Sequence, residues 1–160
     1  MSTNIFDLIR SDFWGPSSRS WYFVTFVNDY SCYSWIFHIK HRSESLQVYP
    51  NFVKMVETKF SKRIKIFRSD NPLECTQYVF QAIFHSYGTI NQLSCLGTSQ
   101  QNGRAKWKLH HILDTVRALL LFAKVPAPFW GKATLYIVHA INRILNPVIH
   151  NQALYERLFG

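Results

Sequence analysis

The sequence is poor in acidic residues, in cysteine and in long apolar runs, and each shortage excludes a class of protein. The longest uninterrupted apolar stretch, around Ala118–Ala123, is far shorter than the roughly 18 residues that a membrane span needs. The N-terminus has no basic-then-apolar secretory signal, and the cysteines Cys32, Cys75 and Cys95 match neither a disulfide framework nor a zinc motif. These absences predict an intracellular protein, nuclear or cytoplasmic, that is not secreted and has no membrane partner.

Aromatic and basic residues are abundant instead. Of the 160 residues, 48% are hydrophobic and 16% aromatic, so residues 1–160 can bury the core of a single domain. Eighteen Lys and Arg against nine Asp and Glu give a net charge of +9, which favours a polyanionic partner, with nucleic acid ahead of a membrane surface. Residues 61–125 hold nine of the basic and three of the acidic residues, so we expect phosphate contacts there.

Hydrophobic periodicity predicts an α/β fold. Apolar runs predict strands over residues 5–13, 21–27, 33–40, 63–67 and 89–93, of which the second and third form a hairpin. Apolar residues at three- and four-residue spacing predict helices that begin after Ser43, near Glu74, near Gly103 and near Pro128. Pro50 falls inside the first helix and predicts a kink or a late start. This order of elements predicts a mixed sheet flanked by helices.

Two aspartates, Asp12 and Asp70, lie at the ends of predicted strands. Ligands gather at the carboxyl ends of strands in α/β sheets, and Mg²⁺ prefers oxygen ligands, so the pair suggests a metal site. Two such ions about 4 Å apart can activate an attacking oxygen and stabilise a leaving one in phosphodiester chemistry. The alternative is structural, because an Asp after a strand often serves as a turn or cap residue.

Nine segments, in order along almost the whole chain, carry a resemblance to a known family. They are Phe6–Pro16, Tyr22–Ser31, Arg68–Asn71 with Glu74, Gln92–Cys95, Gln100–Gly103, Arg117–Leu120, Phe129–Gly131, Ile141–Arg143 and Tyr155–Gly160. On these segments the sequence resembles the integrase catalytic core of copia-type (Ty1/copia) retrotransposons. The resemblance implies a ribonuclease-H-like fold with a mixed five-stranded sheet. It also implies a D-D-35-E set of carboxylates that holds Mg²⁺ for 3′-end processing and strand transfer of element DNA.

The third carboxylate of that pattern is missing. Asp12 and Asp70 match the first two positions, as catalytic and metal-binding residues, but Lys106 stands where the glutamate is expected after 35 intervening residues. An ammonium has no lone pair for a metal, and at about 4 Å and an effective dielectric near 20 each unit-charge repulsion costs about 4 kcal/mol. Asp114 lies too far along the helix to substitute, and Glu74 is a regular family feature beside the site. We therefore expect impaired catalysis and weak or lost Mg²⁺ binding.

Further departures from the family pattern point the same way. Pro72 and Leu73 replace a Gly-Gly pair, Arg10 stands where a histidine is usual, and Ser99 replaces a common proline. The zinc module that precedes this core in the family and the polymerase that follows it are absent from the 160 residues. The resemblance therefore predicts an excised or decayed copy.

Basic and loop residues in the middle of the chain are the predicted DNA contacts. They are Lys62, Arg63, Lys65, Arg68, Gln100, Gln101, Asn102, Arg104, Lys106 and Lys108. The alternatives are a solvated basic face and, for Asn102, a helix cap. With no recognition helix, binding should depend on salt and read few bases. Two functions stay open: an impaired integrase core that binds DNA and other integrase chains, and a non-enzymatic DNA-binding or protein-interaction module derived from one.

Overall fold

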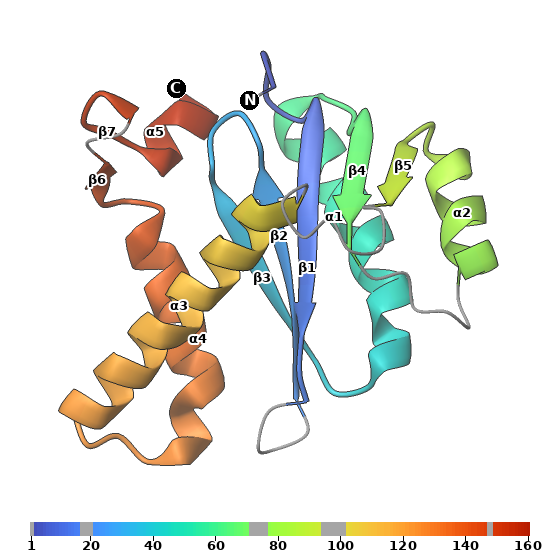
Figure 1. The fold of residues 1–160 in the computed structure, drawn as a ribbon. Helices are drawn as coiled ribbons and strands as arrows, with labels where there is room; N and C mark the ends of the chain where they lie inside the picture. Colours follow the sequence, from blue (N-terminus) through green and yellow to red (C-terminus); the bar gives the residue numbers. More distant parts are fainter. Residues whose placement is uncertain (1, 17–20, 71–76, 94–101, 147–148) are drawn as a thin grey trace.

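A central five-stranded sheet organises the protein (Figure 1). The structure is a computed structural model, and it describes residues 2–16, 21–70, 77–93, 102–146 and 149–160. The strands are β1 (Leu8–Trp14), β2 (Tyr22–Asn28), β3 (Ser34–Ile39), β4 (Ile66–Ser69) and β5 (Ile90–Leu93), in the spatial order β3-β2-β1-β4-β5. The β1–β2 and β2–β3 pairs are antiparallel, whereas the β1–β4 and β4–β5 pairs are parallel. The predicted mixed five-stranded sheet is confirmed.

Side-chain chemistry accounts for the hairpin of β2 and β3. β2 is aromatic and β-branched, and six of its seven residues are buried, as expected for a strand covered on both faces. At its end, Asn28 Oδ1 accepts hydrogen bonds from the amides of Tyr30 and Ser31 at 3.0 and 3.2 Å. Such an Asx turn lets the chain reverse direction. The predicted hairpin is confirmed.

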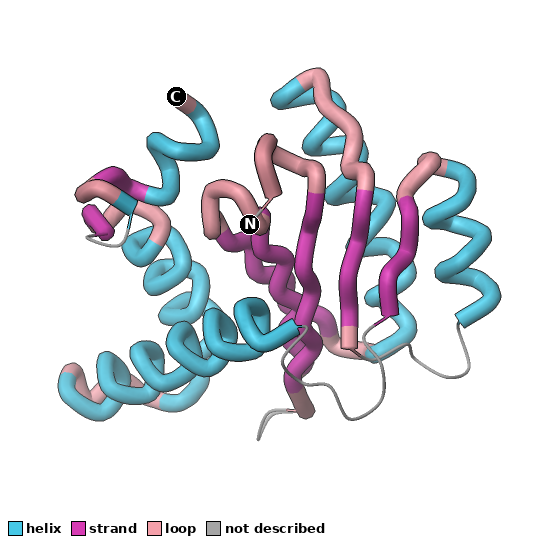
Figure 2. Tube along the Cα trace, turned by 45° about the horizontal axis from the view of Figure 1, so that its top comes forward, coloured by secondary structure: helices cyan, strands magenta, loops and turns pink. Residues whose placement is uncertain are grey.

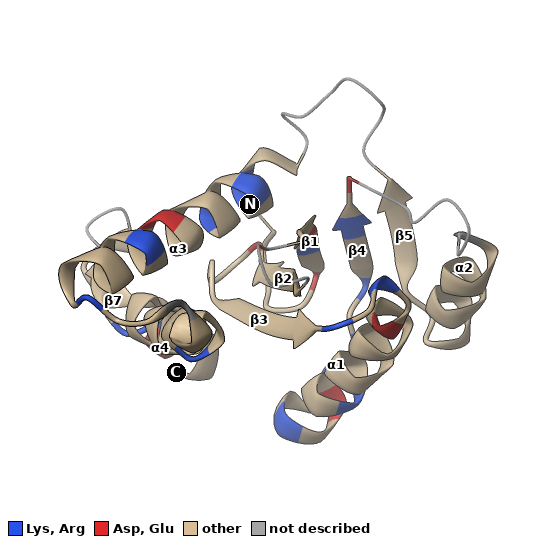
Figure 3. Cartoon of the chain, turned by 90° about the horizontal axis from the view of Figure 1, so that it is seen from below, with Lys and Arg blue, Asp and Glu red and all other residues tan. Residues whose placement is uncertain are grey.

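Helices cover both faces of the sheet (Figures 2 and 3). α1 (Ser45–Phe60) and α2 (Gln77–Ser86) pack on one face, and α3 (Gly103–Phe122) and α4 (Trp130–Ile141) pack on the other. The C-terminal part adds a small ladder of β6 (Leu145–Asn146) and β7 (Gln152–Ala153), followed by α5 (Leu154–Phe159). None of the helices within the described ranges is long and apolar enough to cross a membrane.

Two hydrophobic cores hold these layers together, one on each face of the sheet. Under α1 and α2 the core is aromatic, with Tyr49 against Phe67 at 4.9 Å between ring centroids. Under α3 and α4 the core is mostly aliphatic and includes the fully buried Ile112 and Val116. Burying one such side chain contributes about 1.5–3 kcal/mol, so the two cores fix α3 on the opposite face from α1.

The start of α1 differs from the prediction. Ser43 lies inside a short 3-10 turn, Arg42–Glu44, rather than capping the helix. α1 begins directly afterwards at Ser45 and continues through Pro50, so the predicted late start is wrong. Proline has no amide hydrogen to donate to the preceding turn. The burial of Tyr49 beside it helps to hold the helix across this missing bond.

Candidate metal and nucleic-acid site

The two predicted carboxylates lie on neighbouring parallel strands. Ser11 of β1 pairs with Ser69 of β4, so Asp12 and Asp70 each come one residue after a paired position. Because successive side chains of a strand point to opposite faces, Asp12 and Arg10 lie on the same face of β1. α3 packs on this face, and the pairing register therefore brings Asp12 and Asp70 together beneath the start of α3.

Lys106 lies in the first turn of α3 and forms an ion pair with Asp70, from its Nζ to Asp70 Oδ2. The Lys106 side chain is 40% exposed and that of Asp70 is 14% exposed. The hydrogen bond to Asp70, together with the negative charges of Asp70 and Asp12, raises the pKa of the Lys106 ammonium. Because water screens the exposed partner, such a pair adds on the order of 1 kcal/mol or less to stability.

Asp12 titrates in a partly buried environment. Burial raises the pKa of the Asp12 carboxyl, and the neighbouring charge of Asp70 acts in the same direction. The amide of Phe13, which donates to Asp12 Oδ1 at 3.0 Å, and the ammonium of Lys106 lower the pKa and offset part of this rise. Asp12, Asp70 and Lys106 therefore form one electrostatic unit assembled from β1, β4 and α3.

The described residues do not fit a complete magnesium centre. Mg²⁺ needs near-octahedral oxygen ligation, to which a lysine ammonium adds no ligand and an opposing charge. Within the described ranges, no three His, Cys, Asp or Glu side chains come together in a way that could hold a metal ion. Asp114 is 68% exposed and pairs with Arg117 at 3.0 Å. Glu74 lies outside the described residues, so its predicted place beside the site stays a prediction.

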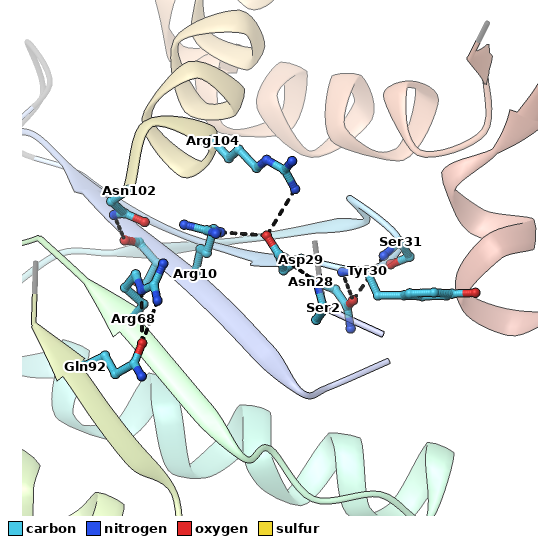
Figure 4. Close-up of polar contacts among 11 residues, drawn as sticks. Ser2, Arg10, Asn28, Asp29, Tyr30, Ser31, Arg68, Gln92, Asn102 and Arg104 are labelled. Atoms are coloured by element: carbon cyan, nitrogen blue, oxygen red, sulfur yellow. Dashed lines mark hydrogen bonds and ion pairs between the residues drawn. The ribbon is translucent and has the colours of Figure 1, made fainter. Parts of the chain in front are cut away.

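Asn102 occupies a different environment from the one that the sequence suggested. Its side chain is fully buried, makes no cap hydrogen bond, and donates from Nδ2 to the Ser11 carbonyl at 2.8 Å (Figure 4). The predicted cap is therefore wrong, and a fully buried amide does not present itself to DNA. Asn102 instead ties the start of α3 to β1, one residue before Asp12. Gln100 and Gln101, the other predicted loop contacts, lie outside the described residues.

Asp29, which the sequence analysis did not single out, joins three segments of the chain. It is 2% exposed, and its Oδ1 faces Arg10 Nε at 2.8 Å and an Arg104 guanidinium nitrogen at 3.2 Å (Figure 4). The Ser2 amide donates to Oδ2 at 2.6 Å. Burial alone would raise the pKa of Asp29, but these hydrogen bonds and the charges of Arg10 and Arg104 outweigh it and lower the pKa. The only sequence signal was an acidic residue directly after a buried strand.

The predicted DNA contacts divide between the two ends of the sheet. Lys106 lies at the site, and Arg68 lies beside it on β4, donating to Gln92 Oε1 at 2.6 and 3.2 Å. Arg104, in the same turn of α3, instead reaches Asp29, whose amide donates to the Leu8 carbonyl at the start of β1. Residues 62–65 instead connect α1 to the start of β4, at the end of the sheet opposite Asp70 (Figure 1). In that connection Lys65 pairs with Asp7 at 2.7 Å. The structure therefore brings together only part of the predicted basic set.

Lys108 is buried in α3 and is 9% exposed. Burial lowers the pKa of its ammonium. It follows Ala105 by three residues and precedes Ile112 by four, so the spacing that places these two buried residues on one helix face also includes Lys108. The prediction of a phosphate contact did not take this spacing into account, and a phosphate contact would require the buried ammonium to become accessible.

Comparison with solved structures defines the class of protein. The fold matches a chain of a simian T-cell lymphotropic virus intasome, determined in complex with the PP2A regulatory subunit B56 gamma, with a TM-score of 0.75 and 14% identity over 96% of this chain and 54% of that one. It also matches the HTLV-2 integrase catalytic core domain in complex with magnesium, in a trimeric form, with a TM-score of 0.73 and 12% identity over 98% of both chains. The fold is that of an integrase catalytic core, which is ribonuclease-H-like.

Curated relatives give the particular family, although no protein-family model matches the sequence. The retrovirus-related Pol polyprotein from transposon TNT 1-94 of Nicotiana tabacum is 36% identical over 88% of this chain. Those from transposons RE1 and RE2 of Arabidopsis thaliana are each 30% identical over 99% of it. The chain spans only 11% of the length of each relative. It is a retrotransposon integrase core domain, homologous to part of the Pol polyproteins of copia-type transposons.

Proposed function

We propose that this integrase core binds DNA but does not carry out strand transfer. The observation that carries the proposal is the Lys106–Asp70 ion pair, which places an ammonium where the resemblance expects the third metal-binding carboxylate. Magnesium, when bound to such a core, would supply the activated oxygen and the stabilised leaving group of phosphodiester chemistry. Among the described residues, Asp12 and Asp70 are the two that could contribute ligands at this site, and Lys106 neutralises one of them.

DNA is the partner that the remaining chemistry supports. The chain carries a net charge of +9, Arg68 and Lys106 lie at the end of the sheet where the carboxylates lie, and Arg104 lies in the same helix turn as Lys106. Cationic side chains of this kind bind phosphates and release counterions, so affinity falls steeply with salt. A nuclear or cytoplasmic location follows from this proposed partner.

A second candidate function is a non-enzymatic module that docks on other integrase chains. The solved neighbours include an intasome and a trimeric core, both of them assemblies, and this supports a protein partner for the same fold. Filter binding to a duplex across a salt series separates the candidates. Strong salt dependence supports DNA binding, and a flat response favours protein docking.

A strand-transfer or disintegration assay with Mg²⁺ tests the loss of catalysis. The unmodified chain should give no product above background. The homologous segment of the tobacco relative, prepared in the same way, serves as the positive control. Clear product from the unmodified chain, abolished by Asp70→Asn, would refute the proposal.

A further inference from the structure

The contacts of Lys106 go beyond the loss of a metal ligand. We propose that the Lys106 ammonium is the permanent cation of this site and takes the place of a divalent metal ion, so that Asp12 and Asp70 are held together without metal. The inference deepens the proposed function, because a core with a built-in cation would bind DNA in the absence of Mg²⁺. Its test uses no DNA, so its failure can be told apart from a failure of DNA binding.

Geometry supports this role. Lys106 Nζ pairs with Asp70 Oδ2, and among the described residues no hydrogen-bond donor reaches the other oxygen, Asp70 Oδ1, which is buried. Lys106 is thus the cation seen to balance the charge of Asp70. Asp12 feels the same ammonium from the neighbouring strand. A divalent ion entering between the carboxylates would have to displace this ammonium or tolerate its repulsion.

The ammonium is held in place by the anchoring of its helix. Asn102 fixes the start of α3 to the Ser11 carbonyl, and Arg104 joins the same turn to Asp29. These two contacts, made from positions 102 and 104, come just before Lys106 at the start of the same helix. A flexible lysine on such a fixed helix start pays less entropy to stay near Asp70 than one on a mobile loop.

The chain contains a matched pair for comparison. Lys65 and Asp7 form an ion pair at 2.7 Å between the segments that lead into β4 and β1, at the opposite end of the same two strands. The Asp7 side chain is 18% exposed, close to the 14% of Asp70, whereas Lys65 is more exposed than Lys106, at 68% against 40%. Within the described ranges no metal-binding cluster forms at this end either. Lys65→Gln therefore removes a Lys–Asp pair where the resemblance expects no metal.

Thermal melting in EDTA and then in millimolar Mg²⁺ or Mn²⁺ tests the inference on the whole chain. The unmodified protein and Lys65→Gln should melt at the same temperature with and without metal. Lys106→Glu should melt at a lower temperature in EDTA, because three carboxylates then repel one another. Saturating metal at about a hundredfold over its dissociation constant should raise that temperature by about 5–10 °C. Calorimetric titration of Mn²⁺ should detect binding to Lys106→Glu alone among these three proteins.

Two results would overturn the inference. The first is a metal-dependent rise in the melting temperature of the unmodified protein that matches the rise in Lys106→Glu. The second is no metal response in Lys106→Glu, because something other than Lys106 would then keep metal out. If Lys106→Glu does not fold in EDTA, Lys106→Gln replaces it, since this variant removes the cation without adding charge. Lys106→Gln should then show a smaller Mn²⁺-dependent rise, and its absence would equally refute the inference.

Discussion

At the scale of single residues, Asn102 shows how a buried amide sets the geometry of the site. Its hydrogen bond to the Ser11 carbonyl joins positions that are 91 residues apart in sequence. Nothing in the local sequence distinguishes this role from a helix cap, because both use the same side chain at the same helix start. The contact forms only because the fold brings β1 next to the start of α3, and this proximity cannot be read from the local sequence.

Asn102→Ala should lower the free energy of unfolding by about 1–3 kcal/mol, because the Ser11 carbonyl would lose its donor and remain buried. Urea denaturation followed by circular dichroism measures the change. Asn51→Ala is the matched control, since Asn51 is exposed on α1 and its replacement should cost nothing. Equal stability of the two variants would contradict the structural role of Asn102.

Asp29 makes the free energy of unfolding depend on pH in the acidic range. Its folded-state pKa lies below the usual 3.8, so the unfolded chain takes up this proton more readily than the folded protein. The stabilisation is complete above pH 3.8 and is lost as the pH falls through the lowered folded-state pKa. We expect Asp29→Asn to lose about 3 kcal/mol at neutral pH, because the buried negative charge that pairs with Arg10 and Arg104 is removed.

Urea denaturation between about pH 7 and about pH 3 measures both effects of Asp29→Asn. The variant should lose less stability on acidification than the unmodified protein, because the group responsible has been removed. Asp114→Asn, at an exposed position, should follow the unmodified protein. If Asp29→Asn lost as much stability on acidification as the unmodified protein, other carboxyl groups would be responsible for the loss.

At the scale of elements, the sequence predicted the helices and strands better than their starts. Apolar runs predicted a strand near each of the five strands of the sheet, because buried strands are rich in apolar residues. The fourth was predicted over residues 63–67, whereas β4 spans Ile66–Ser69. Helix starts depend on hydrogen bonds of one or two side chains, and Ser43 was a plausible cap that the fold does not use. Lys108 shows the reverse case. Its spacing from Ala105 and Ile112 indicated a buried position, but the prediction followed its basic side chain and expected a phosphate contact.

Pro50 gives the element-scale prediction. Pro50→Ala should raise the free energy of unfolding by about 2 kcal/mol, because α1 regains a hydrogen bond and loses a ring clash. This net figure already subtracts the conformational entropy that the unfolded chain gains when proline is removed. Thermal and urea denaturation measure the gain. Pro126→Ala, outside the helices, is the control, and it should be neutral or slightly destabilising. No gain at Pro50 would mean that α1 accommodates the proline without strain.

At the scale of the whole molecule, the basic residues lie at two ends of the sheet. The sequence showed that residues 61–125 are basic but not that β4 separates residues 62–65 from the carboxylate end. Strand pairing determines this separation, and the parallel register of β1 and β4 leaves no local sequence signal. Their positions at strand ends already suggested that Asp12 and Asp70 form a metal site, with a turn or cap role as the alternative, and the resemblance favoured the metal site.

This separation predicts where DNA binds. Arg104→Gln should weaken binding and reduce the slope of log affinity against log salt by about one, because one phosphate contact is lost at the start of α3. Lys62→Gln makes the same charge change at the opposite end of β4 and should leave the slope unchanged. Filter binding over a salt series measures both, with circular dichroism confirming the fold of Arg104→Gln. A larger effect at Lys62 would place DNA at the other end.

Lys106 also has a consequence at the level of the gene. Both lysine codons become glutamate codons when their first base changes from adenine to guanine. The helix start that would present the new carboxylate is already fixed by Asn102, and Asp70 already lies opposite it. A single transition mutation would therefore place a carboxylate at position 106, where the resemblance expects the third one.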